Sequence, residues 1–250
     1  MNLDGVIIIL PAFVAGLLII ATHVPLGLEV LKRGIIFIDL AVAQVAGLGV
    51  IVAGLYFHSE EYPIVTQIMA FIFAISAAYG FKLCEKHMPK LQEAIIGSAY
   101  VFASSLALLL MANHPHGAEE VENLLSGQLL WASWSQIVLT AIIYALLWIV
   151  IFNKDLLHKY FYFIFAIAIT MSVQLAGVYL VFASLILPAI GAVIYEKGNK
   201  IMFGYVVSTV SLIVGLVVSL LSDLPTGPAL VCVLFLTFPI ILTIKAARRS

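Results

Sequence analysis

One acidic residue of this chain lies inside a long apolar run, and it is the first candidate for chemistry. Asp39 occurs in the stretch GIIFIDLAVAQVAGLG. A charged side chain at the centre of a membrane-spanning helix costs about 2.5–3.5 kcal/mol on insertion scales, so residues of this kind are commonly functional. Asp39 also comes less than two helical turns after Lys32 and Arg33, at a helix start where the helix dipole favours an acid. Two interpretations therefore stay open, an ion site and a helix-terminal acid.

A second candidate is the segment NHPHGAEEVE, which gathers imidazole and carboxylate groups. The residues concerned are His114, His116, Glu119 and Glu120. Such groups together suit zinc, manganese or iron(II). Their spacing matches no closed structural zinc site, and acids in loops are usually solvated. The segment is expected either to collect metal ions or to form a solvated docking surface, and His58 with Glu60 and Glu61 repeats the pattern more weakly.

No group of residues has the spacing of a catalytic site. The serines at 98, 104 and 105 have no histidine partner nearby, and neither an HExxH motif nor a GxxxxGK[ST] phosphate loop occurs. The chain is therefore not expected to be an enzyme or to bind a cofactor. If ATP powers it, another polypeptide must bind the ATP.

The elements that position these residues follow from the composition. Of the 250 residues, 64% are hydrophobic and 10% are charged, against about 25% charged in a typical soluble domain. A soluble protein could not cover its surface with so few charges. The net charge of -1 argues against nucleic acid as a partner. We expect a single transmembrane domain over residues 1–250.

Breaks in the apolar runs predict about nine membrane-spanning helices, because a span takes roughly 20 apolar residues. The predicted spans are 5–23, 35–57, 64–83, 94–112, 137–152, 160–177, 178–196, 201–221 and 227–244. Length alone does not decide whether 160–196 forms one tilted helix or two short ones that meet near Ala176-Gly177.

The basic residues settle that question in favour of nine spans. All 12 occur in five places, namely Lys32/Arg33, Lys82/Lys86/Lys90, Lys154/Lys159, Lys197/Lys200 and Lys245/Arg248/Arg249. With nine spans, all five places fall on one side of the membrane, which the positive-inside rule makes cytoplasmic. The predicted fold is therefore an all-α polytopic bundle with its N-terminus outside and its C-terminus inside.

Four stretches together resemble one family. They are PLGLEVLKRGIIFIDLAVAQVAGLG (25–49), LLSGQLLWASWSQI (124–137), QLAGVYLVFASLILPAIGA (174–192) and GLVVSLLSDLPTGPALV (215–231). In order and spacing they are similar to the zinc/manganese/iron permeases of ATP-binding-cassette importers, over nearly the whole chain. The resemblance implies a multi-pass protein of the bacterial inner membrane that forms the path for a divalent metal ion. It also implies three partners: a second permease copy, cytoplasmic ATP-binding subunits and an extracytoplasmic metal-binding protein.

The chain departs from the family pattern in two places. The family pairs an Asp on the second helix with a His four residues later; Asp39 matches the Asp, but the later position is Ala43. The cytoplasmic segment between the fifth and sixth helices is also shorter than in the family, at 153–160. Two alternatives stay open: the ATPase contact uses 84–93 instead, or the contact is smaller than usual. The alternative functions are an ion-coupled secondary transporter or channel, with Asp39 as its ion or proton site, and a membrane scaffold without transport activity.

Overall fold

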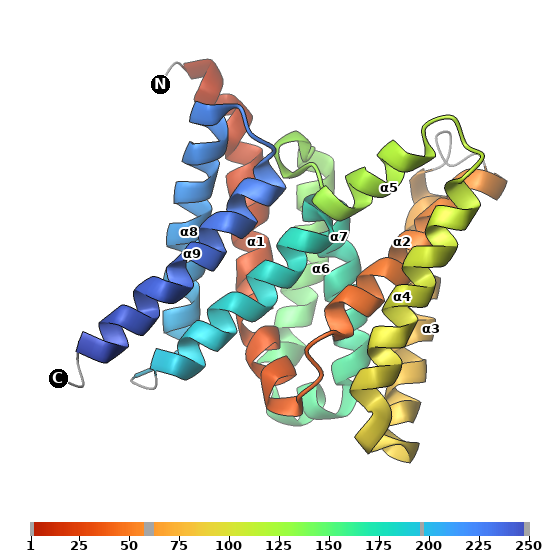
Figure 1. Cartoon of the computed structure of the whole chain (residues 1–250), viewed down its shortest axis with the longest axis horizontal. Coiled ribbons are helices and arrows are strands. Elements are labelled where there is room, and N and C mark those ends of the chain that lie inside the picture. Colours follow the sequence, from red (N-terminus) through yellow and green to blue (C-terminus); the bar gives the residue numbers. More distant parts are fainter. Residues whose placement is uncertain (1–2, 58–62, 196–197, 248–250) are drawn as a thin grey trace.

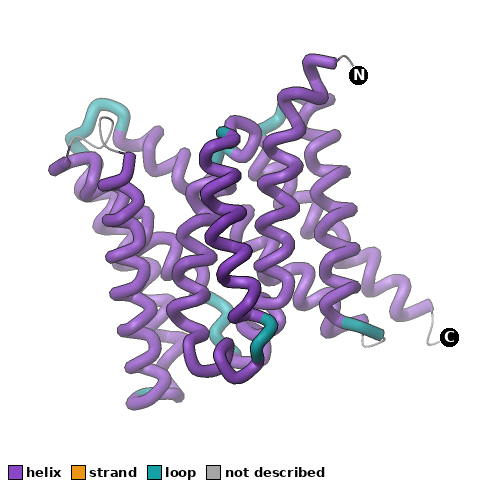
Figure 2. Tube along the Cα trace, turned by 180° about the vertical axis from the view of Figure 1, so that it is seen from behind, coloured by secondary structure: helices purple, strands orange, loops and turns teal. Residues whose placement is uncertain are grey.

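The computed structural model describes residues 3–57, 63–195 and 198–247 of the chain. Within these residues every regular element is a helix and no strand occurs (Figure 2). The elements are α1 (Leu3–Arg33), α2 (Ile38–Phe57), α3 (Pro63–His87), η1 (Pro89–Leu91), α4 (Gln92–Met111), α5 (Gly117–Ser126), η2 (Leu129–Trp131), α6 (Trp134–Ile151), α7 (Lys154–Tyr195), α8 (Lys200–Ser222) and α9 (Thr226–Ala247), where η1 and η2 are short 3-10 helices. The expected all-α bundle is confirmed.

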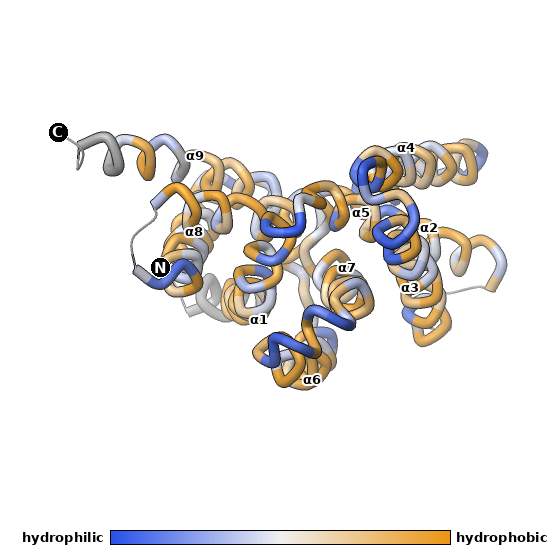
Figure 3. Tube along the Cα trace, turned by 90° about the horizontal axis from the view of Figure 1, so that it is seen from below, coloured by the Kyte–Doolittle hydropathy of each residue, from blue (hydrophilic) through white to orange (hydrophobic). Residues whose placement is uncertain are grey.

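Eight helices in the described part of the chain are long and apolar enough to cross a membrane. The remaining α-helix, α5, has ten residues and lies between the predicted spans 94–112 and 137–152. Large apolar side chains are exposed around the bundle, as at Ile64, Leu109 and Ile149, and the helices are mostly apolar along their length (Figure 3). Apolar surface of this extent is not stable in water, so we conclude that hydrocarbon covers these faces.

The 42-residue helix α7 contains a break that divides it into two spans. Gly177 has φ 75° and ψ 165°, a conformation that other residues adopt only with strain. Beyond this residue the second half of α7, drawn in cyan, runs back toward the end of the molecule where the first half begins (Figure 1). The predicted division near Ala176-Gly177 is confirmed, and eight helices, one of them crossing twice, give nine crossings.

The first helix is longer than predicted. The span was expected to end at residue 23, before Pro25, but α1 continues to Arg33. A proline removes the backbone donor that would bond to the carbonyl four residues earlier, here that of Ala21. In the structure this carbonyl accepts hydrogen bonds from Trp148 Nε1 of α6 (3.3 Å) and from the Tyr205 hydroxyl of α8 (3.0 Å). Other helices therefore satisfy the freed group, and α1 does not have to stop.

Helix α7 forms the centre of the bundle. It packs against α1, α2, α3, α5, α6, α8 and α9. Phe161 and Phe165 are fully buried near its start, and Leu185 is fully buried in its second half. A side chain that touches α7 is consequently held by the most buried element of the fold.

The basic side chains of the described residues gather at one end of the bundle. They lie at the ends of α1 and α3, in η1, and at the starts of α7 and α8, which Figure 1 shows at the lower edge, opposite the N-terminus. The separation of charge that the sequence predicted therefore holds in three dimensions. Which end faces the cytoplasm stays a prediction of the positive-inside rule.

Labelling of introduced cysteines tests that orientation. In a background that lacks Cys84 and Cys232, we expect Glu120→Cys to react with a membrane-impermeant maleimide in intact cells. Lys154→Cys should react only after permeabilisation, because it lies at the basic end. Glu60 and Lys197, which the sequence also suggests as labelling sites, lie outside the described residues. Ready labelling of Lys154→Cys in intact cells would show that the orientation is inverted.

Candidate functional site

Asp39 is buried in the first turn of α2 and is only 1% exposed. No side chain among the described residues donates a hydrogen bond to its carboxyl oxygens, and the donors that act on them are the backbone N–H groups of Asp39 and Leu40 in the same turn. The helix dipole stabilises a charge in this position by about 0.3–1 kcal/mol, which is less than the several kcal/mol that burial of an unpaired carboxylate costs. The burial of Asp39 therefore favours an ion site over a purely helix-terminal role, and the choice between the two stays a prediction.

A second acid, Glu93, accompanies Asp39 and was not identified from the sequence. It lies in the first turn of α4, and its Oε1 accepts a hydrogen bond of 3.0 Å from the backbone N–H of Phe37, two residues before Asp39. Its Oε2 atom is buried without a partner among the described residues. Helices α2 and α4 pack against each other. The structure thus places Glu93 beside the backbone that leads into Asp39, and three of the four carboxyl oxygen atoms of these two acids have no side-chain donor among the described residues.

Ala43 occupies the position where the family has a histidine, and in the structure this position is apolar and enclosed. It lies one turn after Asp39 on α2, is 1% exposed and belongs to the main hydrophobic core. No imidazole reaches the two acids from this position. The donors that the site offers are carboxylate oxygens.

The outer candidate residues lie near the opposite end of the bundle, around the start of α5 (Figure 1). The structure places them in two separate pairs: His114 Nδ1 is 3.6 Å from Glu120 Oε1, and His116 Nδ1 is 3.7 Å from Glu119 Oε2. All four side chains are exposed. Among the described residues no group of three or more His, Cys, Asp or Glu is arranged to hold a metal ion, and His58, Glu60 and Glu61 lie outside those residues.

A buried histidine is a further residue that the sequence reasoning missed. His23 lies on α1 with no exposed surface, and its Nδ1 is 2.9 Å from the carbonyl oxygen of Ile19. Since Nδ1 donates to that carbonyl, Nε2 carries the lone pair, and it has no partner in the described part of the chain. The sequence did contain a signal for His23, because an ionisable residue inside an apolar run is rare and commonly functional. The side chain that contacts His23 through a hydrogen bond is Thr22, whose Oγ1 lies 3.2 Å from the Nδ1 of His23.

Three glycines join α5, the break in α7 and the start of α9 at the end of the bundle where α5 lies. A Cβ atom at Gly127 would lie closer than 3.0 Å to the backbone of Ala176 and Gly177, and one at Gly177 equally close to the backbone of Gly127. A Cβ at Gly227 would overlap the carbonyl oxygen of Ser126. The three backbones therefore touch directly. Each glycine comes from a different one of the four stretches on which the family resemblance rests.

Comparison with protein families decides the class of the chain. The model of the ABC 3 transport family matches residues 6–161 and 150–245. The chain belongs to the ABC 3 transport family. The fold is also similar to a chain of the structure described as PsaBC from Streptococcus pneumoniae in complex with Fab, at 18% sequence identity and a TM-score of 0.77, with 95% of this chain and 93% of that chain covered. No curated protein matches the sequence.

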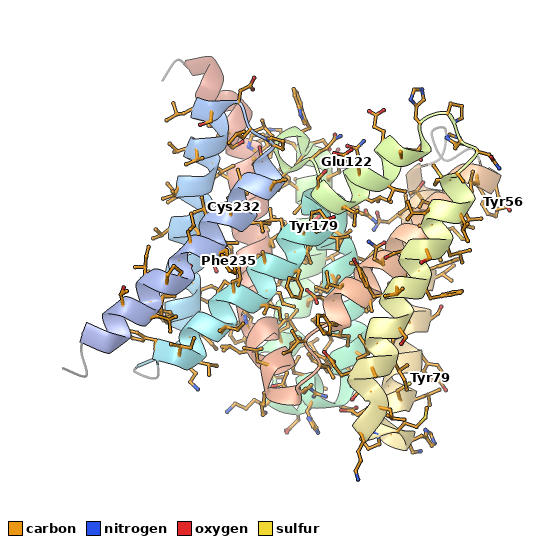
Figure 4. The ribbon with its side chains drawn as sticks, viewed as in Figure 1. Tyr56, Tyr79, Glu122, Tyr179, Cys232 and Phe235 are labelled. Atoms are coloured by element: carbon orange, nitrogen blue, oxygen red, sulfur yellow. The ribbon has the colours of Figure 1, made fainter. Side chains whose placement is uncertain are left out.

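Membership in the ABC 3 transport family, together with the apolar helices, makes the chain a multi-pass transmembrane subunit of an ABC importer. The glycine junction and the acids Asp39 and Glu93 are then features of an ABC 3 permease. Tyr179 of α7 and Phe235 of α9 are exposed on the face that Figure 4 presents, together with Glu122 on α5.

Proposed function

We propose that this ABC 3 permease carries a divalent transition-metal ion, zinc, manganese or iron(II), inward across the bacterial inner membrane. The observation that supports it most strongly is the pairing of a buried acid, Asp39, with a half-buried one, Glu93, since three of their four carboxyl oxygen atoms have no side-chain donor among the described residues. Two like charges in a site of low dielectric repel, and a divalent cation between them offsets both the repulsion and the lost hydration. The ion is the substrate of the permease and not a resident cofactor.

The donor atoms of the site favour manganese over zinc. Carboxylate oxygens suit manganese, whereas imidazole suits zinc better. Because Ala43 stands where the family has a histidine, the site of this chain offers oxygen donors without a nitrogen donor from α2. We therefore propose manganese as the preferred substrate, with iron(II) next and zinc last.

Restoring the imidazole should change this preference. Ala43→His places a nitrogen donor four residues after Asp39, on the same face of α2. We expect zinc to be retained more tightly than manganese and to be released more slowly, as measured by competitive uptake of the two ions. Because Ala43 is buried, the larger side chain costs about 1–3 kcal/mol of stability from overpacking.

Ala41→His is the matched control, since Ala41 is equally buried on α2 but lies two residues from Asp39 and so faces away from it. It should lower stability to a similar degree without altering the metal preference. An equal shift toward zinc in both variants would show that the effect does not arise at Asp39.

The partners that we propose are a second permease copy, cytoplasmic ATPase subunits and an extracytoplasmic metal-binding protein. The face that exposes Tyr179 and Phe235 is available to the second copy (Figure 4). The turn between α3 and α4 is available to the ATPase, because it exposes Met88 and Leu91 at the basic end. Glu93 follows this turn directly, so a displacement of the turn would move one of the two acids.

The outer pairs are proposed to receive the ion or to dock the delivery protein, and two variants separate these roles. If the histidines collect metal, His114→Ala with His116→Ala should lower uptake by several-fold at limiting metal and have little effect at saturating metal. If the segment docks a protein, Glu119→Lys with Glu120→Lys should have the larger effect at every metal concentration. Normal uptake by both double variants would make the segment a solvated connector.

A further inference from the structure

A cavity of about 910 Å³ opens at the basic end of the bundle, and neither Asp39 nor Glu93 lines it. Its walls come from the last turns of α1 and α6, the first turn of α7, the end of α7 and the start of α8. Most of the lining is apolar, with Leu28, Ile194 and Ile201 as examples. Its volume is within the range of about 300–1,000 Å³ that is usual for ligand sites.

The polar side chains of the cavity are mainly cationic. Lys32, Lys154 and Lys200 line it, and the first is 77% exposed. Lys154 and Lys200 make no ion pair within the described part of the chain. The acid among the described lining residues, Glu29, already binds Arg33, with 2.9 Å between its Oε1 and the guanidinium Nε. The rim therefore keeps a net positive charge.

His158 adds a hydrogen-bond donor to that rim. The Arg33 Nη2 donates to its Nδ1 over 3.1 Å, which leaves the ring hydrogen on Nε2. Arg33 also donates to the backbone carbonyl of His158 (3.3 Å). The histidine is thus held in place by α1 while its other nitrogen remains a donor.

The cavity lies on a side of the bundle that borders hydrocarbon. Next to it, Ile149 and Phe152 at the end of α6 and Met202 at the start of α8 are 71%, 55% and 61% exposed. Seen along the bundle, α6 lies on the side opposite α9 and α4 (Figure 3). The cavity is consequently on the far side from the face that is available to a second copy, at the level where a row of lysines marks the membrane surface.

We infer that this cavity binds an anionic phospholipid of the cytoplasmic leaflet, with the phosphate between Lys154, Lys200 and His158. The acyl chains would cover the apolar wall that Leu28 and Ile194 form. Basic pockets between membrane helices on the cytoplasmic side bind anionic head groups, and each lysine near the surface contributes about 1 kcal/mol. An apolar wall below a cationic rim fits a lipid better than it fits a soluble anion, which has no apolar part.

Native mass spectrometry of the full-length chain with dioleoylphosphatidylglycerol and dioleoylphosphatidylcholine tests this. We expect the wild-type chain to retain phosphatidylglycerol in preference to phosphatidylcholine. Lys154→Gln with Lys200→Gln should weaken phosphatidylglycerol binding on the order of tenfold. Lys86→Gln with Lys90→Gln removes the same charge at the same end of the bundle but outside the cavity, and it should leave binding unchanged.

Three results would overturn the proposal. Equal losses in both double variants would mean that general surface charge attracts the lipid, and equal retention of both lipids would mean that the charges play no part. Displacement of the lipid by millimolar inorganic phosphate, or by an added ATPase subunit, would assign the rim to a soluble anion or to that partner. The thermal unfolding midpoint of each variant shows whether a loss reflects misfolding instead, and the glutamine substitutions at exposed lysines are not expected to change it.

Discussion

Replacing Asp39 by asparagine is expected to lower metal transport by more than about tenfold while leaving the protein folded. The substitution keeps the shape of the side chain and removes the charge that a divalent cation requires. Loss of one group near a metal commonly costs 10–100-fold in affinity or activity. Because the carboxylate is buried without a side-chain partner, its removal also abolishes a desolvation cost. The metal-free variant should therefore unfold at a temperature equal to or above that of the wild type.

Asp155→Asn is the matched control for this experiment. Asp155 also lies in the first turn of a helix at the basic end, but its side chain is exposed. If Asp39 served only as a helix-terminal acid, the two variants would behave alike, each with a small loss of stability and normal transport. Glu93→Gln should show an intermediate loss of transport, since one oxygen of Glu93 already accepts the hydrogen bond from Phe37.

Adding a methyl group at the glycine junction is expected to prevent normal folding. Gly177→Ala combines a backbone conformation that alanine adopts only with strain and a Cβ atom closer than 3.0 Å to the backbone of Gly127. Strain of this kind costs about 1–3 kcal/mol, and overpacking costs a similar amount. The atoms that the new Cβ would meet belong to the backbone of Gly127 and Ser126, which cannot move aside as a flexible side chain could. We therefore expect the variant to lose about 3 kcal/mol or more of folding free energy. Fluorescence-detected size-exclusion chromatography should show little monodisperse protein.

Gly80→Ala and Gly97→Ala provide controls within the same chain. Both glycines lie in helices, α3 and α4, and a Cβ atom at either position would meet no neighbour within 4 Å. Alanine has a higher helix propensity by about 0.8–1.0 kcal/mol, so these variants should be at least as stable as the wild type. A Gly177→Ala variant with wild-type yield and unfolding midpoint would show that the contact between α5 and α7 is not required.

The sequence predicted the spans well because a membrane imposes a simple rule on composition. Apolar runs of sufficient length mark the helices, and the distribution of lysine and arginine placed the reversal at Gly177, which the structure confirms. The continuation of α1 past Pro25 was not predictable, because Trp148 and Tyr205, which bond the freed carbonyl, are far away in the sequence. Local rules do not contain the partners that other helices supply.

Only part of the candidate site was predicted, because the sequence does not show which residues the other helices bring to it. Asp39 could be identified because an acid inside an apolar run is rare. Glu93 could not, because it follows a polar connection and looks like a solvated acid until the fold brings it beside Phe37. The glycine junction is similar: Gly127, Gly177 and Gly227 belong to separate stretches, and only packing shows that their backbones touch. His23 was identifiable from its position in an apolar run and was overlooked.

Uptake by the purified transporter in proteoliposomes distinguishes an ATP-driven metal importer from the other functions that the sequence left open. With the permease, its ATPase subunits and ATP on the cytoplasmic side, and with the metal-binding protein on the other side, radioactive manganese should accumulate inside the compartment that contains ATP. Accumulation should disappear when ATP is omitted and when Asp39→Asn replaces the wild type. If manganese instead enters at the same rate without ATP, driven by a proton or ion gradient alone, the chain is a secondary transporter or channel, and the proposed function is wrong.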